Sequence, residues 1–362
     1  MQQIPQKESL TPLGALEAAV LPALRRPPCL VSFSGGLDSS VVLGAAVRAA
    51  RGAGLPLPVP ITLRYPDAPE TEEAAWQELV VRHLNLGEWQ VRQVTDEHDL
   101  LGPTSTGVLR RHGVLFPANV FANRPVLEAA DQGSVLTGFG GDEISATWSW
   151  RVLADALARR RKPVPRDVLR LAYAAAPQAI RTSVAARWLP PPWLPSWVHP
   201  DVRRAVAVLH SRERAAEPVR WSRWVEWQAG RPEIAATAWS MDVLAADAGT
   251  KVFHPLLDPR YLAALACRGG RFGFGSRLSL MKTLFADVIP AKLLTRSRKA
   301  VFGQVFWRSG SREFARSWDG SGVDKNLVDV ETLREEWLKP SPHFGSAMLL
   351  QSAWLYRNGS GP

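Results

Sequence analysis

A glycine-rich turn early in the chain combines residue types that suit phosphate chemistry. The turn is SGGLDS at residues 34–39, between an apolar run at 29–33 and a helical pattern at 39–50. Where a buried strand passes through such a turn into a helix, backbone N–H groups at the positive end of the helix dipole can bind phosphate oxygens. Gly35 and Gly36 leave room for a ligand because they carry no Cβ atom. The turn is therefore a candidate phosphate-binding loop.

The carboxylate in this turn separates it from a simple anion site. Ser34 and Ser39 add hydroxyl donors, but Asp38 would repel phosphate unless a Mg²⁺ ion lies between the two charges. No lysine follows the glycines, as a P-loop requires, and the GxGxxG dinucleotide fingerprint is absent. Two alternatives stay open. One is a hydrolase elbow with Ser34 as nucleophile, which leaves Asp38 unexplained, and the other is a plain turn with helix-capping serines.

A second glycine-rich turn, VLTGFGGDEIS at residues 135–145, ends in the adjacent carboxylates Asp142 and Glu143. Turns of this kind are also common as plain loops. If it follows a strand parallel to the first one, both turns face the ligand crevice at the carboxyl ends of the strands. Asp38 and Asp142 would then hold Mg²⁺ on a triphosphate from opposite sides.

Strand and helix patterns alternate around these two turns. We expect strands at 29–33, 58–65, 89–94 and 134–137, and helices at 39–50, 71–86 and 124–131. This alternation predicts an α/β fold with a doubly wound parallel sheet. Beyond residue 148 the patterns are helical, including 232–247, 259–268, 276–288 and 345–356.

The same change of character suggests how the chain is organised. We expect an N-terminal extension at 1–27, a nucleotide-binding α/β core at 28–147, and a largely helical part at 148–362 that completes the domain.

Composition narrows the classes of function. The net charge of +10 favours an anionic partner such as a nucleotide, nucleic acid or acidic peptide, although an Arg-, Ala- and Pro-rich composition also fits a GC-rich genome. Cys29 and Cys267 form no disulfide framework and no metal-ligand spacing, which argues against zinc. The chain contains no apolar run of about 18 residues and no secretory signal pattern at its start. These features predict a cytoplasmic protein without a membrane span.

The two turns resemble motifs of one enzyme superfamily. SGGLDS resembles the signature loop of the pyrophosphate-loop ATP pyrophosphatases, and GFGGDE resembles the G-x-G-x-D-E motif of asparagine synthetase synthetase domains. The stretches 71–86, 253–266 and 277–302 resemble further segments of that domain in the same order. The chain is thus identified as an asparagine synthetase-type member, similar to β-lactam synthetases and lasso-peptide cyclases, with an adenine nucleotide α-hydrolase-like fold.

The resemblance implies an amide ligase that uses ATP and Mg²⁺. Its metal ligands would be Asp38 and Asp142, and Lys299, beside Arg298, would be the main group that stabilises negative charge on phosphate and on the tetrahedral carbon. The residues expected to bind ATP or pyrophosphate are Val31, Ser34, Gly35, Gly36, Leu37, Asp38, Ser39, Leu63, Gly138 and Lys299. Among these, the positions of Val31, Leu63 and Gly138 make them the expected adenine contacts.

The resemblance also implies the partners. They would be a carboxylate and an amine, carried by a peptide or by small molecules. Delivery by a partner protein is left open, and nucleic acid is disfavoured.

Two departures from the family pattern shape the expected reaction. Position 2 is Gln2 and the first predicted strand begins at residue 29, so this sequence holds no N-terminal glutaminase domain with its cysteine nucleophile. Phe139 stands where asparagine synthetases have Glu and β-lactam-forming enzymes have Tyr, and a phenyl ring can accept no proton. Asp247, Asp258 and His254 are therefore alternative bases.

These departures predict amide formation through an acyl-adenylate without glutamine hydrolysis, in peptide or natural-product biosynthesis. Macrolactam formation of the lasso-cyclase kind is one version of this reaction. A tRNA-modifying pyrophosphate-loop enzyme and a non-catalytic protein that keeps the fold are the alternatives.

Overall fold

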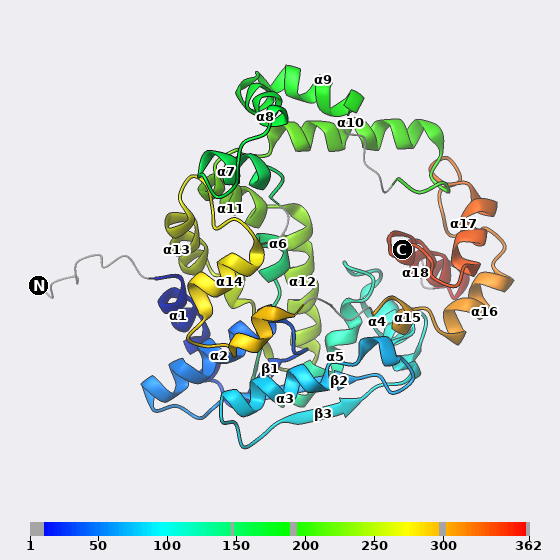
Figure 1. The fold of residues 1–362 in the computed structure, drawn as a ribbon. Coiled ribbons are helices and arrows are strands. Elements are labelled where there is room, and N and C mark those ends of the chain that lie inside the picture. Colours follow the sequence, from blue (N-terminus) through cyan, green and yellow to red (C-terminus); the bar gives the residue numbers. More distant parts are fainter. Residues whose placement is uncertain (1–10, 146–147, 189–193, 297–301, 360–362) are drawn as a thin grey trace, which may run out of the picture.

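The structure, a computed structural model, describes residues 11–145, 148–188, 194–296 and 302–359. Its centre is a sheet of five parallel strands in the order β3-β2-β1-β4-β5 (Figure 1). The strands are β1 (Cys29–Ser32), β2 (Val59–Arg64), β3 (Gln90–Gln93), β4 (Ser134–Leu136) and β5 (Lys251–Phe253). The predicted α/β fold with a doubly wound parallel sheet is confirmed, and the four predicted strands lie close to their expected bounds.

Helices cover both faces of the sheet and form most of the second half of the chain. They are α1 (Pro12–Leu24), α2 (Leu37–Ala53), α3 (Ala74–His83), α4 (Pro103–His112), α5 (Arg124–Ala129), α6 (Gly141–Ser145), α7 (Arg151–Leu157), α8 (Pro165–Ala175), α9 (Gln178–Trp188), α10 (Pro200–Ala216), α11 (Trp221–Ala229), α12 (Pro232–Asp247), α13 (Pro259–Gly269), α14 (Arg277–Phe285), α15 (Gly303–Phe306), α16 (Ser309–Ser317), α17 (Val330–Leu338) and α18 (Ala347–Arg357). Short 3₁₀ helices include η3 (Val120–Asn123) and η5 (Ala291–Thr295).

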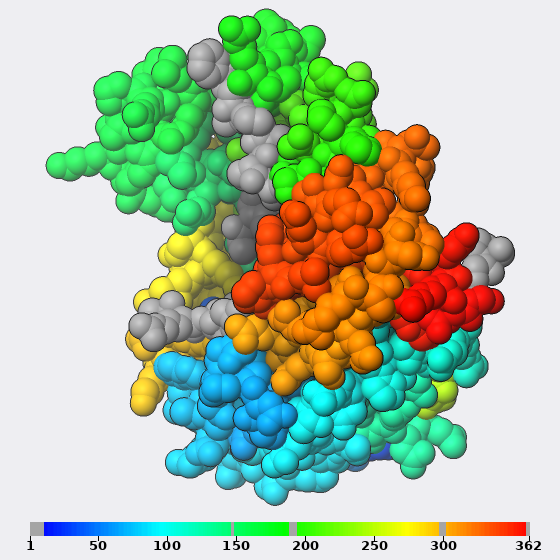
Figure 2. All heavy atoms as spheres, turned by 90° about the vertical axis from the view of Figure 1, so that its right-hand side faces the viewer, coloured from blue at the N-terminus to red at the C-terminus, as the bar shows by residue number. Residues whose placement is uncertain are grey.

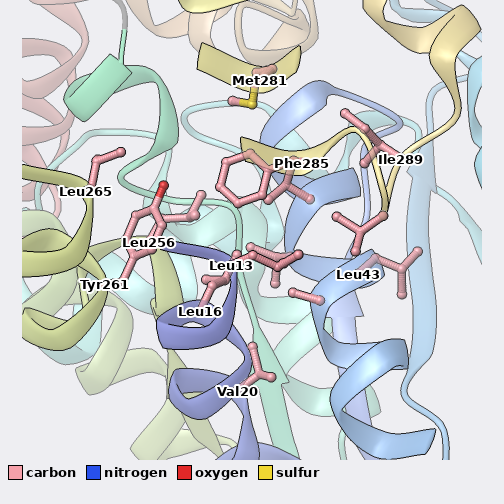
Figure 3. Packing of buried hydrophobic residues seen from close by; sticks show 14 of the residues in the cluster. Leu13, Leu16, Val20, Leu43, Leu256, Tyr261, Leu265, Met281, Phe285 and Ile289 are labelled. Atoms are coloured by element: carbon pink, nitrogen blue, oxygen red, sulfur yellow. The ribbon is translucent and has the colours of Figure 1, made fainter. Parts of the chain in front are cut away.

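The central strand β1 supplies side chains to two hydrophobic cores because successive residues of a strand point to opposite faces. Val31 belongs to the core beneath α1, α2, α13 and α14, part of which Figure 3 shows. Leu30 belongs to the core formed with α4, α5, α12 and α16–α18. Both side chains are almost fully buried. A short apolar run without alternation is thus the expected sequence for this strand.

Helix α1 and strand β5 are among the elements that were not predicted. Helix α1 lies inside the expected N-terminal extension, where Thr11 caps it by accepting a hydrogen bond from Gly14 N at 3.1 Å. Its Leu16 and Val20 are fully buried against the first core (Figure 3). Strand β5 comes from the helical half and pairs with β4, with Leu136 opposite Phe253. The expected division at residues 27 and 147 stays a prediction.

The helices α8, α9 and α10 lie at one end of the molecule, away from the sheet (Figure 1). The segment before α10 is joined to the segment before α17, because Val198 forms an isolated antiparallel bridge with Val328. Figure 2 shows the green residues of this region protruding beyond the rest of the surface. Among the helices that the structure describes, none has the length and apolar character needed to cross a membrane.

Candidate functional site

The first glycine-rich turn links β1 to α2, as predicted. Gly36 is the N-cap residue of α2, and Gly35 has a φ of +81°, a conformation that residues with a Cβ rarely adopt. The two serine hydroxyls lie on the same side of the turn, with Ser34 Oγ 3.2 Å from Ser39 Oγ. Ser34 Oγ also accepts a hydrogen bond from Gly36 N at 3.3 Å. The turn therefore offers hydroxyl groups beside the N-terminus of a 17-residue helix.

This turn borders a cavity of about 590 Å³ in volume. The cavity lies where the carboxyl ends of β1, β2 and β4 meet, which is the ligand-binding edge of a doubly wound sheet. Its walls are formed by Ser32, Ser34, Gly36, Leu37, Asp38, Ser39, Leu63, Tyr65, Pro117, Asn119, Val120, Ala122, Asn123, Thr137, Gly138, Phe139, Asp142, Thr237, Met241, Arg277 and Arg296.

The second glycine-rich turn runs from β4 into α6 and packs directly on the first one. A Cβ atom on Gly138 would lie 2.8 Å from Ser39 N, and a Cβ atom on Gly141 would lie 2.2 Å from Asp38 Oδ1. A side chain at Gly138 would displace backbone atoms, and one at Gly141 would displace the Asp38 carboxylate. This close packing brings the two turns to one end of the cavity, as the sequence predicted for parallel neighbours.

The carboxylates of Asp38 and Asp142 converge on one cationic side chain. Arg277, at the start of α14, places Nη2 2.5 Å from Asp38 Oδ2 and contacts Asp142 Oδ1 through Nη1. The side chain of Asp38 is 14 % exposed and that of Asp142 is 41 % exposed. The shared guanidinium places both carboxylates at the same end of the cavity.

The donor set fits Mg²⁺ bound together with a triphosphate. No group of three or more His, Cys, Asp or Glu side chains that could hold a metal occurs among the described residues. Magnesium usually takes one or two protein carboxylates and completes its octahedral shell with water and substrate phosphates. Asp38 and Asp142 provide that number, and the adjacent turn provides the phosphate site.

A second arginine, Arg296, contacts the backbone of the first turn. Arg296 follows η5 and donates a hydrogen bond to Gly35 O at 3.2 Å. It also forms an ion pair with Glu73, the N-cap residue of α3. The side chains are only 9 % and 8 % exposed, so this is a buried pair. Arg296 thereby joins the phosphate-binding turn to α3 and to the C-terminal part of the chain.

Sequence reasoning missed both arginines of the cavity. The positive charge was assigned to Arg298 and Lys299, which lie outside the described residues. Arg296 stands two positions earlier in the same basic stretch TRSRK, and Arg277 begins the family-like segment 277–302. Both arginines therefore lie within the family-like segment 277–302.

The predicted adenine contacts are placed as follows. Leu63 of β2 and Gly138 line the cavity. Val31 is fully buried in β1 and, like Gly35, is not among the lining residues. For Val31, only main-chain contact with a ligand is compatible with this burial. All three adenine contacts remain predictions.

Of the three alternative bases, His254 lies nearest to the site. It follows β5, its Nδ1 lies 2.7 Å from the cavity residue Thr137 Oγ1, and its ring meets that of Phe139 edge to face at 5.3 Å. Burial lowers the pKa of His254 to about 4, so the imidazole is neutral at pH 7. Asp247 instead pairs with His112 at 2.6 Å, and Asp258 caps α13.

The side of the cavity formed by η3 and α12 is mostly uncharged. It presents the amides of Asn119 and Asn123, the hydroxyl of Thr237 and the thioether of Met241. These residues come from segments with no motif, so no local pattern marked them as site residues. Their chemistry suits an uncharged polar part of a substrate rather than a phosphate.

The sheet order and the two facing glycine-rich turns define a nucleotide-binding α/β protein with a pyrophosphate-loop signature. The sequence model of the family described as asparagine synthase matches residues 13–355, and the chain belongs to this family. The resemblance drawn from the sequence is thereby confirmed. A search of curated protein sequences returned no match. Enzymes of this family form amide bonds with consumption of ATP, usually with Mg²⁺, and this is the general activity that the family assigns to the chain.

Proposed function

We propose that this protein joins a carboxylate to an amine through an acyl-adenylate and releases AMP and pyrophosphate, without hydrolysing glutamine. The observation that carries the proposal is the convergence of Asp38 and Asp142 on one cation beside the SGGLDS turn. A triphosphate placed there would meet the hydroxyls of Ser34 and Ser39 and the N-terminus of α2. The metal, when bound to both carboxylates, would offset the triphosphate charge.

In this reaction a carboxylate oxygen of the substrate attacks the α-phosphorus, and the bond from that phosphorus to the bridging oxygen breaks. Pyrophosphate leaves into the turn at residues 34–39. The amine then attacks the acyl carbon, AMP leaves with the bonding electrons, and the proton lost by the amine passes to the departing phosphate or to water. Arg277 and Arg296 line the cavity and supply positive charge to the phosphates, and Lys299 remains the predicted stabiliser of the adenylate.

The chemistry of the cavity favours an amine with a low pKa, because such an amine has a larger neutral fraction at pH 7. No histidine or lysine is found among its described lining residues, and His254 reaches it only through Thr137 Oγ1. With a pKa of about 4, His254 is too weak a base to hold the proton, and we assign it the orientation of the Thr137 hydroxyl. A peptide α-amine, with an ordinary pKa of about 7.7–8.0, fits better than a lysine side chain at about 10.4.

The uncharged side of the cavity supports a peptide as substrate. Asn119, Asn123 and Thr237 can exchange hydrogen bonds with peptide groups, and Met241 adds an adaptable apolar contact. An acidic side chain of a peptide and its own α-amine would together give a macrolactam. The proposed setting is therefore peptide or natural-product biosynthesis.

The first test is exchange of labelled pyrophosphate into ATP in the presence of Mg²⁺ and size-separated fractions of a host-cell extract. We expect one fraction to stimulate exchange, and its size to distinguish a small acid from a peptide. Hydroxylamine added to that fraction should trap the acyl group as a hydroxamate. Asp38→Asn should abolish exchange, whereas Asp287→Asn, a matched change at an exposed position, should not. Equal exchange by both variants would contradict the proposal.

A further inference from the structure

The positive charge of the protein is concentrated in one segment. Residues 151–216, which span α7 to α10, contain thirteen basic and four acidic residues, and thus nine of the ten net positive charges. The remainder of the chain, including the ATP site, is nearly neutral overall. A GC-rich genome would spread arginine along the whole chain, so composition alone does not explain this concentration. The segment is the part of the molecule that protrudes (Figure 2).

Helix α8 in this segment presents an apolar stripe to solvent. Val164, Val168 and Leu171 follow one another at i, i+4 and i+7, which places them on one face of the helix. Val168 is 70 % exposed and Leu171 is 49 % exposed. The adjacent Leu169 is 71 % exposed. A stripe of this kind normally packs on a core, and here it has no cover within the described structure.

Buried polar contacts hold α8 in this orientation. Asp167, which lies next to Leu171 on the helix surface, accepts hydrogen bonds from Arg161 at 2.5 Å, from Arg170 at 2.8 Å and from Val164 N at 2.9 Å. The Arg161 guanidinium and these other donors hold the pKa of Asp167 well below its ordinary range. Because Arg161 also donates to Val152 O in α7, this network ties the start of α8 to α7.

A cavity of about 280 Å³ opens beside the stripe. Its lining is apolar except for Arg220 and Arg271, both of which are exposed. Neither arginine forms an ion pair within the described structure. The lining residues are Trp150, Leu153, Ala154, Leu157, Leu171, Ala174, Ala175, Val219, Arg220, Arg271 and Phe272. This cavity shares no residue with the ATP-site cavity.

We propose that the stripe and this cavity form a docking surface for an acidic amphipathic segment of another protein. One apolar side chain of the partner would fill the cavity. The carboxylates of the partner would pair with Arg220 and Arg271 and with the positive charge of residues 151–216. A nucleic acid would satisfy the arginines but leave Val168 and Leu171 uncovered. A lipid headgroup layer would leave the cavity unexplained. The inference does not rest on the ligase reaction.

The test is selection of binders from a phage library of random dodecapeptides on the immobilised full chain. We expect the selected peptides to be acidic and to carry apolar residues at helical spacing. Synthetic fluorescein-labelled copies should bind the wild-type chain, and their binding should weaken at least tenfold with Val168→Glu and with Arg220→Glu. Leu57→Glu, 40 % exposed before β2, and Arg92→Glu, on β3, are the matched controls and should change binding less than twofold.

Circular dichroism and pyrophosphate exchange verify that the variants remain folded and that the ATP site is intact. Peptides that lack acidic residues, or that bind Val168→Glu and Arg220→Glu as well as the wild type, would overturn the proposal. So would the absence of any enriched peptide. If phosphatidylglycerol vesicles or an RNA oligonucleotide bind instead and Arg220→Glu abolishes that binding, the surface belongs to a different class of partner.

Discussion

A guanidinium nitrogen of Arg277 lies 2.5 Å from a carboxylate oxygen of Asp38, although the residues are 239 positions apart in the sequence. The same guanidinium also reaches Asp142. Arg277 thus occupies the place between two carboxylates where a divalent ion is expected. A guanidinium of the chain itself and Mg²⁺ cannot both make all of these contacts, so at the proposed metal site they would compete for the two carboxylates.

Replacing Arg277 by Met should increase the effect of Mg²⁺ on stability. Without the guanidinium, Asp38 and Asp142 repel each other more strongly, so the melting temperature in EDTA should fall. Because the metal no longer displaces a protein cation, added Mg²⁺ should raise the melting temperature by more than in the wild type. Differential scanning fluorimetry in EDTA and in Mg²⁺ measures both values. Arg92→Met serves as the control, and an identical Mg²⁺ effect in all three proteins would rule out the competition.

Arg296→Met should destabilise the protein strongly. The substitution removes the cation that contacts the buried carboxylate of Glu73, and breaking a buried pair in this way costs about 3–5 kcal/mol. The double variant with Glu73→Gln should recover part of that loss. It should not recover pyrophosphate exchange, because the hydrogen bond to Gly35 O is still missing. Urea unfolding and exchange assays separate the two effects, and full recovery of exchange would contradict the role in positioning the turn.

His98 should make the protein less stable as the pH falls. Its side chain is fully buried, with Nδ1 3.0 Å from the hydroxyl of the cavity residue Tyr65. Burial lowers the pKa of His98 to about 4, below the ordinary value of about 6.5. Above pH 6.5 the imidazole is neutral in both states, so it makes no pH-dependent contribution. Between pH 6.5 and 4 the imidazole is protonated in the unfolded chain but stays neutral in the folded chain, so the free energy of unfolding falls.

The measurement is the free energy of unfolding at pH 7 and pH 5. The wild type should lose about 2 kcal/mol more than His98→Gln over this interval. The buried His254 contributes equally in both proteins and cancels in the comparison. An equal loss in the two proteins would show that His98 is protonated as easily in the folded state as in the unfolded one.

Gly141→Ala should separate catalysis from folding. The new Cβ atom would lie 2.2 Å from Asp38 Oδ1, so the Asp38 carboxylate must move. Misplacement of a reacting group by about 1 Å can lower a rate about 100-fold, and we expect a loss of this size in pyrophosphate exchange. Gly52→Ala, in α2, meets no atom within 4 Å and should stabilise the protein by about 0.5–1 kcal/mol with exchange unchanged. Retained exchange in Gly141→Ala would argue against the assigned position of Asp38.

The parts of the fold with strong local patterns could be predicted from the sequence. Strand β1 is a short apolar run before a glycine-rich turn, and α12 begins at Pro232 and ends at Asp247 as expected. Strand β5 was missed because its three residues, Lys251–Phe253, are too few to show the alternation or apolar run that marks a strand. Only the pairing with β4 makes them a strand. Helix α1 was missed because Glu17 and Pro22 interrupt its apolar run.

The site shows the same contrast between local and long-range information. Both glycine-rich turns and the convergence of Asp38 with Asp142 followed from motifs and from the rule that ligands bind at the carboxyl ends of parallel strands. The contacts of Arg277 and Arg296 join segments more than 200 residues apart, and no local pattern reports such a contact. Asn119, Asn123 and Thr237 reach the cavity for the same reason: tertiary packing alone places them there.

The late position of β5 in the sequence has a consequence for synthesis on the ribosome. Strand β4 ends at residue 136, but its outer neighbour begins only at residue 251. Until that segment emerges, the apolar edge Ser134–Leu136 lacks the partner strand that completes its hydrogen bonds, and an open edge of this kind promotes pairing with other chains. More than a hundred residues must therefore be translated while this edge is exposed. A chain stalled between β4 and β5 should therefore be prone to aggregation.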